Sequence, residues 1–131
     1  MKATGLFEVK LSPQSMEDAA GGVKLGRMSI DKQFHGDLEA TSKGEMLSAM
    51  TGVKGSAGYV AIERVEGSLG GRKGAFVLQH TGTMARGAQQ LSVTVVPDSA
   101  SGELAGLEGR MNIIIEGGKH SYEFEYKFAE G

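Results

Sequence analysis

Apolar and polar side chains alternate one by one along several separate stretches of this chain. The alternation is clearest in residues 122–128 and 27–35. One face of the first stretch is aromatic and consists of Tyr122, Phe124, Tyr126 and Phe128. One face of the second stretch carries Met28, Ile30, Lys32 and Phe34. A period of two is typical of a β-strand that buries one face, so the pattern predicts a mainly β protein.

Further runs with strand character follow one another along the whole chain. The predicted strands are residues 3–11, 27–35, 38–49, 57–69, 74–84, 91–96, 104–115 and 119–128. Turn signals, most of them rich in glycine, separate them at residues 21–22, 35–37, 51–55, 70–74, 86–87 and 117–118. Residues 12–22 form a polar interval that is predicted to be a surface loop.

Helix content is expected to be low. Residues 16–20 have the composition of one helical turn, and residues 45–50 have helical propensity. Neither segment has a sustained 3.6-residue repeat. About eight strands with short connections predict an all-β fold, an antiparallel up-and-down barrel that forms one domain over residues 1–131. Closure of the barrel would remove exposed strand edges, and a β-sandwich is the alternative.

Composition adds an unusual glycine content, 21 of 131 residues, with two prolines and neither cysteine nor tryptophan. The glycines lack a three-residue period, which excludes collagen, and the absence of cysteine excludes disulfide scaffolds, zinc ribbons and cysteine nucleophiles. Six glycines fall inside or beside predicted strands: Gly5, Gly58, Gly67, Gly82, Gly106 and Gly109. We expect them to bend the strands of a small barrel, the alternative being close approach by a ligand or another backbone.

The charge balance gives no sign of a nucleic-acid partner. Fourteen basic and sixteen acidic residues leave a formal charge of −2, and the basic residues are scattered. Nucleic-acid binding normally needs a basic face. No apolar run has the length of a signal peptide or a membrane span, so we expect a cytoplasmic protein without a membrane partner.

Four blocks of sequence carry a resemblance to a known family. They are ATGLFEV at residues 3–9, FHGDLEATS at 34–42, GGRKGAFVLQHTGT at 70–83 and VVPDSASGELAGLEG at 95–109. Together they resemble a bacterial domain-of-unknown-function family whose members look like allene oxide cyclase-type, calycin-like eight-stranded barrels. Residues 100–102, Ala-Ser-Gly, depart from the Gly-Thr-Gly of that pattern. The resemblance implies the barrel and, since such barrels associate through their walls, a homodimer or homotrimer. It implies no chemistry.

Motifs for most kinds of chemistry are missing. The glycine-rich run 67–72 has neither a Gly-Lys-Ser/Thr ending nor a following helix pattern, so it is not a phosphate-binding loop. No serine nucleophile elbow occurs. The histidines His35, His80 and His120 lack metal-ligand spacing, so no metal site is expected. No motif for a nicotinamide, flavin, pyridoxal phosphate or haem cofactor is present, and we expect no cofactor.

The remaining candidates for a site are Glu63, Arg72, His80 and Tyr126. Glu63 and His80 share the apolar faces of two strands joined by the turn at residues 70–71, which would place them in one barrel as an acid–base pair. A buried, mutually satisfied polar pair or two outward side chains are the alternatives. Arg72 would clamp a carboxylate at the barrel mouth or bind turn carbonyls. The Tyr126 hydroxyl would point into a cavity, although its aromatic stripe is predicted to be core.

These features predict a module that binds a small apolar or amphipathic ligand in the barrel, with no catalytic residue assigned. Whether the protein is an enzyme is left open. A cofactor-independent isomerase or cyclase acting in the barrel pocket is the first alternative, by analogy of fold with allene oxide cyclase. A structural homo-oligomer without a ligand is the second alternative.

Overall fold

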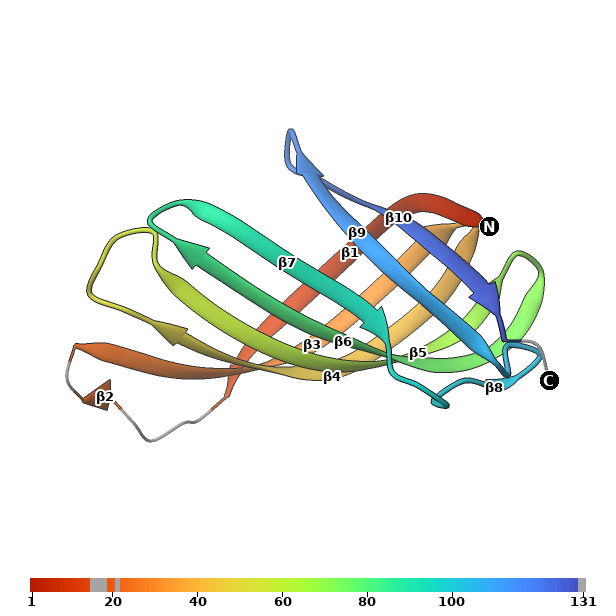
Figure 1. The fold of residues 1–131 in the computed structure, drawn as a ribbon, viewed down its shortest axis with the longest axis horizontal. Coiled ribbons are helices and arrows are strands. Elements are labelled where there is room, and N and C mark those ends of the chain that lie inside the picture. The colour runs from red at the N-terminus through yellow and green to blue at the C-terminus, as the bar shows by residue number, and fades with distance from the viewer. Residues whose placement is uncertain (15–18, 21, 130–131) are drawn as a thin grey trace.

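The computed structural model describes residues 1–14, 19–20 and 22–129, and these form strands and turns without a helix (Figure 1). The strands are β1 (Lys2–Gln14), β2 (Ala19–Ala20), β3 (Val23–Gly36), β4 (Leu38–Met50), β5 (Ala57–Leu69), β6 (Arg72–Ala85), β7 (Ala88–Val95), β8 (Ser101–Gly102), β9 (Leu107–Glu116) and β10 (Lys119–Phe128). No helix that could cross a membrane occurs within the part of the chain that the structure describes.

Eight long antiparallel strands form a closed barrel, which confirms the predicted fold. Strand β3 pairs with β4, β4 with β5, β5 with β6 and β6 with β7. Strand β9 pairs with β10. Strand β1 pairs with both β10 and β3 and so closes the sheet on itself. The seam between β7 and β9 is joined at a single registered pair, Thr94 with Arg110. The short strands β2 and β8 are added at the edges of β3 and β6.

The strand boundaries differ from the predicted ones in three places. Residues 45–50, which have helical propensity, are part of β4, because ladders to β3 and β5 satisfy their backbone on both sides. Residues 104–106 lie in a turn, and β9 begins only at Leu107. Strand β1 continues to Gln14 into the predicted loop, in which Ala19 and Ala20 form β2. Residues 15–18 and 21 of that loop lie outside the described residues.

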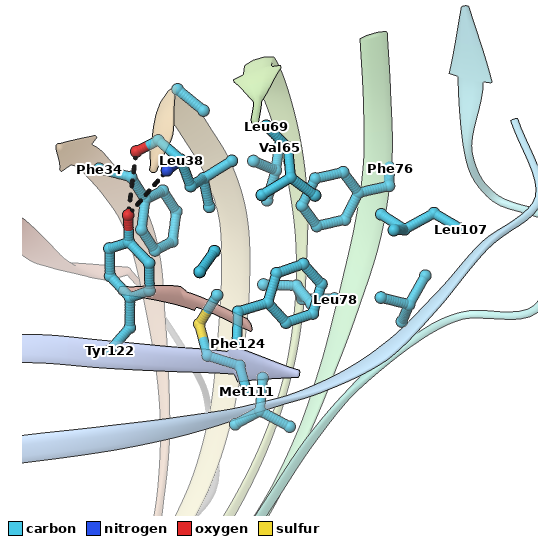
Figure 2. Packing of buried hydrophobic residues seen from close by; sticks show 14 of the residues in the cluster. Phe34, Leu38, Val65, Leu69, Phe76, Leu78, Leu107, Met111, Tyr122 and Phe124 are labelled. Carbon is cyan, nitrogen blue, oxygen red and sulfur yellow. Dashed lines mark hydrogen bonds between the residues drawn. The ribbon is translucent and has the colours of Figure 1, made fainter. Parts of the chain in front are cut away.

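The hydrophobic core packs at the end of the barrel that carries the β3–β4 and β5–β6 turns, which we call the closed end. Figure 2 shows its buried side chains from close by. Its most buried large side chains come from both halves of the chain and include Phe34, Leu38, Val65, Leu69, Phe76, Leu78, Leu104, Tyr122 and Phe124. Phe76 and Phe124 stack with ring centroids 5.9 Å apart, and Phe34 meets Tyr122 edge to face at 5.6 Å. Each such side chain contributes about 1.5–3 kcal/mol by leaving water, so this end holds the barrel closed.

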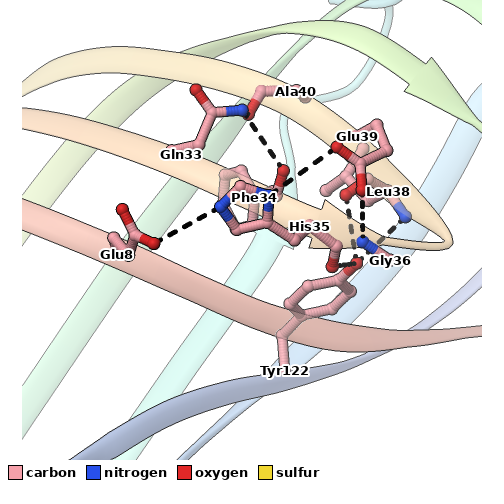
Figure 3. A network of polar contacts seen from close by, with 9 residues as sticks. All are labelled: Glu8, Gln33, Phe34, His35, Gly36, Leu38, Glu39, Ala40 and Tyr122. Atoms are coloured by element: carbon pink, nitrogen blue, oxygen red, sulfur yellow. Dashed lines mark hydrogen bonds and ion pairs between the residues drawn. The ribbon is translucent and has the colours of Figure 1, made fainter.

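The hydroxyl of Tyr122 links β10 to the hairpin between β3 and β4 by hydrogen bonds (Figure 3). The hydroxyl donates to the carbonyl of His35 at 2.8 Å and accepts from the backbone amide of Leu38 at 2.9 Å. Gly5 lies beside this contact, where a Cβ atom would overlap the His35 carbonyl and come within 2.6 Å of the Tyr122 hydroxyl. At Gly5, therefore, the reason for glycine inside a strand is close approach by another part of the protein.

Candidate functional site

Between the apolar core and the other end of the barrel, the interior contains the carboxylate of Glu63, whose side chain is fully buried. Its Oε2 atom accepts a hydrogen bond from Nζ of Lys32 on β3 at 2.8 Å, and its Oε1 atom accepts from Oγ of Ser42 on β4 at 3.0 Å. Lys32 reaches Glu63 across β4, where Gly44 lies opposite Glu63 in the ladder. A Cβ atom at Gly44 would overlap the backbone of Ile62 and Glu63, so glycine at this position allows β4 and β5 to approach closely.

His80 on β6 completes this buried cluster. It lies opposite Ala61 and therefore diagonal to Glu63, and only 3% of its surface is exposed. Nε2 is 2.8 Å from Oε2 of Glu63, but the contact lacks hydrogen-bond geometry, and this buried nitrogen has no aligned partner among the described residues. On the other side of the ring, Nδ1 is 3.5 Å from the hydroxyl of Tyr59. His80 is thus the least satisfied member of the cluster.

The surroundings of Glu63 favour its ionised form. Burial by itself would raise the pKa of the carboxyl, since a charge is poorly solvated inside the barrel. The contacts with His80 and Lys32 outweigh burial and hold the pKa of Glu63 below its ordinary value. The Lys32 ammonium also lies 5.2 Å and 5.7 Å from the ring centroids of Phe7 and Phe34, where cation–π attraction adds to the ion pair.

Tyr59 connects the cluster with the opposite end of the barrel. Its ring lies against Gly82 on β6, where a Cβ atom would overlap the ring, and next to Leu91 on β7. Tyr59 is partly exposed, whereas Glu63 and His80 are buried. Burial first, and the negative charge of Glu63 second, raise the pKa of the Tyr59 hydroxyl, so it stays protonated. The polar groups therefore run from the buried carboxylate to the neutral hydroxyl of a partly exposed tyrosine.

The end of the barrel beyond Tyr59 carries exposed apolar side chains; we call this end the mouth. Three apolar side chains there lie opposite interior positions of neighbouring strands yet are exposed: Leu11 at 45%, Leu91 at 46% and Ile115 at 64%. Beyond the single pair that joins them, β7 and β9 diverge toward their hairpins (Figure 1). The mouth thus presents apolar side chains that the described residues leave exposed.

Two of the four predicted site residues lie together, and two lie elsewhere. Glu63 and His80 are in contact inside the barrel. Arg72 stands at the β5–β6 turn, roughly 20 Å along the ladder from Glu63, with its guanidinium carbon 4.4 Å from the ring centroid of Phe128. Tyr126 is at the same closed end, its ring 5.4 Å from that of Phe124 and its hydroxyl near the β5–β6 turn.

Sequence reasoning missed three members of the cluster. Lys32 had a signal, because it falls on the apolar face of residues 27–35, where a charged side chain needs an internal partner. Tyr59 shares a strand face with Glu63, so its place in the interior was also readable. Ser42 is a small polar side chain with no distinguishing pattern. A group of three or more histidine or acidic side chains that could hold a metal ion is not found within the described ranges.

Comparisons with known proteins agree on one family. The model of the family described as "Protein of unknown function (DUF3224)" matches residues 3–126. The crystal structure of a DUF3224 protein of unknown function from Shewanella oneidensis MR-1 is 58% identical in sequence, with a TM-score of 0.97. The match covers 100% of this chain and 98% of that one. No protein with a curated description matches this chain.

Proposed function

Because this chain belongs to the DUF3224 family, described only by its unknown function, we propose from the geometry that it binds a small, largely apolar molecule in the mouth of the barrel. The observation that carries the proposal is the contrast between the two ends. Interior side chains at the closed end, such as Phe34 and Phe124, have no exposed surface, while Leu11, Leu91 and Ile115 are about half exposed or more. An apolar ligand would cover this surface.

The buried cluster gives the mouth a polar floor. Ligand sites are typically apolar walls with a few convergent polar groups, and Tyr59 with His80 behind it supplies such groups here. On the side of the ring away from Tyr59, His80 contacts Glu63, which is paired with Lys32. This arrangement supports a ligand with an apolar body and at least one polar group.

Placing a charge in the mouth is expected to weaken binding. We predict that Leu91→Asp lowers the affinity for the neutral fluorescent probe N-phenyl-1-naphthylamine about tenfold or more, since one apolar contact is lost and a carboxylate enters. Fluorescence titration measures the effect. The matched control is Leu6→Asp, at a leucine of β1 that is 52% exposed on the outer wall. Absence of probe binding, or equal loss in both variants, would refute the proposal.

A second candidate role, self-association, is supported by a patch on the outer wall. Leu47, Val60 and Ile62 are each about half exposed and lie together on β4 and β5, with Leu47 opposite Val60. They line a shallow hollow whose rim carries the ion pair of Arg27 and Glu45. An apolar centre with a polar rim is the usual anatomy of an interface between subunits.

We expect this patch to bury itself against a second copy of the chain. Val60→Asp would then convert a dimer or trimer to the monomer, because the substitution places two or more carboxylates at the centre of a symmetric interface. Sedimentation analysis over a range of protein concentrations measures the state, and Leu6→Asp on the other side of the barrel is the control. A wild-type protein that stays monomeric at all concentrations contradicts the idea.

A further inference from the structure

We propose that the Tyr59 hydroxyl is the polar contact of the ligand and acts as a hydrogen-bond acceptor. The ligand class that follows is a neutral, mainly apolar molecule with a hydroxyl or N–H donor. This inference rests on the proposed binding in the mouth and goes beyond it by specifying the chemistry of the ligand.

The first step fixes the hydrogen on Nε2 of His80. Glu63 is a carboxylate, because it accepts from Lys32 and Ser42 and its neighbours stabilise the charge. Nε2 lies 2.8 Å from Oε2 of that carboxylate. Even without ideal alignment, a hydrogen on Nε2 is attracted to this carboxylate oxygen, whereas a bare nitrogen lone pair is repelled by it, so Nε2 carries the ring hydrogen.

The second step fixes the hydrogen of Tyr59. The ring of His80 carries its hydrogen on Nε2, the nitrogen that faces Glu63. In the neutral ring Nδ1 is therefore an acceptor. The Tyr59 hydroxyl, 3.5 Å away, directs its single hydrogen toward Nδ1. What the hydroxyl then offers to the mouth is its lone pairs.

The third step concerns the charge of the ligand. The carboxylate of Glu63 disfavours negative charge at the Tyr59 hydroxyl, in addition to the effect of burial. An anionic head group at that position meets the same repulsion. A cationic head group cannot reach the carboxylate, because Glu63 is fully buried and both of its oxygens already accept hydrogen bonds, from Lys32 and from Ser42. A neutral donor satisfies the Tyr59 lone pairs without burying a new charge.

Gly82 is the positioning residue for this contact. The Tyr59 ring occupies the space that a side chain at Gly82 would fill, and Leu91 borders the same space. The absence of a side chain at Gly82 thus allows the ring to lie flat against β6, with its hydroxyl near His80. This interior glycine makes room for an aromatic side chain at the floor of the mouth.

Three probes with one carbon skeleton test the inference: 2-naphthol, 2-methoxynaphthalene and 2-naphthoate. At neutral pH the first is a neutral donor, the second has no donor and the third is an anion. We expect 2-naphthol to bind roughly three- to tenfold more tightly than 2-methoxynaphthalene, the range of one hydrogen bond, and 2-naphthoate to bind weakest. Naphthalene fluorescence reports binding directly, since the protein contains no tryptophan.

Tyr59→Phe is expected to abolish the preference for 2-naphthol over 2-methoxynaphthalene and to leave the affinity for 2-methoxynaphthalene within about twofold of wild type. Tyr126→Phe, at the closed end, is the matched control and keeps the preference. Labelling the ζ carbon of the three tyrosines gives a readout in the unaltered protein: the Tyr59 signal shifts with 2-naphthol more than with 2-methoxynaphthalene.

The outcomes separate the two proposals. A preference for 2-naphthol that persists in Tyr59→Phe, a Tyr59 signal that responds equally to both neutral probes, or tightest binding of 2-naphthoate overturns the role of Tyr59 and leaves binding in the mouth intact. Binding of all three probes that survives Leu91→Asp unchanged overturns the mouth as the site. Failure of all three probes to bind overturns both.

Discussion

Glu63→Gln is expected to lower the free energy of unfolding by about 3–5 kcal/mol. The substitution leaves the ammonium of Lys32 buried without its counter-charge, and that side chain is only 6% exposed. Urea denaturation measures the change. The matched control is Glu66→Gln on the same strand, where the carboxylate pairs with Arg64 in solvent, and a loss below about 1 kcal/mol is expected. A loss from Glu63→Gln no larger than the control would contradict the account of the buried pair.

Adding Lys32→Met to Glu63→Gln is expected to recover at least half of that loss, since the unpaired charge is removed and Met fits beside Phe7 and Phe34. The pH dependence supplies an independent check. The pKa of Glu63 is lowered from 4.5 in the folded protein, so its contribution to stability is complete above that value and is lost as the pH falls through the folded-state pKa. The double variant should show a weaker loss of stability in acid than the wild type.

Gly5→Ala is expected to destabilise the barrel by about 3 kcal/mol, at the upper end of what overpacking costs. The added methyl group overlaps the backbone carbonyl of His35 and approaches the Tyr122 hydroxyl. This carbonyl belongs to the β3–β4 hairpin, which the hydrogen bond from Tyr122 holds in place. Thermal and urea unfolding measure the loss. The control is Gly58→Ala in β5, where the nearest atom to the new Cβ is 3.8 Å away and where a change within about 1 kcal/mol is expected. Equal effects at both glycines would show that backbone entropy, and not close approach, dominates.

Local patterns were sufficient to predict the barrel. Alternation in residues 27–35 and 122–128 defined strand faces, and the glycine pairs defined the turns, so eight antiparallel strands followed. The patterns were weaker where neighbours decide the conformation. Residues 45–50 have helical propensity, yet they are strand because β3 and β5 pair with them on both sides. Residues 104–106 looked like strand, but they fold back as a turn.

The site could be predicted only where one hairpin contains it. Strands β5 and β6 are joined by the turn at Gly70 and Gly71, so their register brings Glu63 and His80 together, as the alternation suggested. Lys32 comes from β3, two strands away from Glu63, and its ammonium reaches the carboxylate across β4. A contact that skips a strand has no signature in local sequence. Arg72 lies beside the turn, and local sequence likewise did not predict its distance from Glu63 and His80 in the middle of the strands.

The single registered pair between β7 and β9 has a mechanical consequence. Every other neighbouring pair of long strands is held by a ladder of at least six residue pairs, whereas β7 and β9 share one registered pair, Thr94 with Arg110, and are otherwise held by buried side chains such as Val93, Val95 and Met111. The β9–β10 hairpin is otherwise anchored through β1, which acts as its hinge. Rotation of that hairpin away from β7 would therefore break little backbone hydrogen bonding at the seam. Such a rotation would change the width of the mouth while the packed end keeps its ladders, so ligands of unequal width could be accommodated.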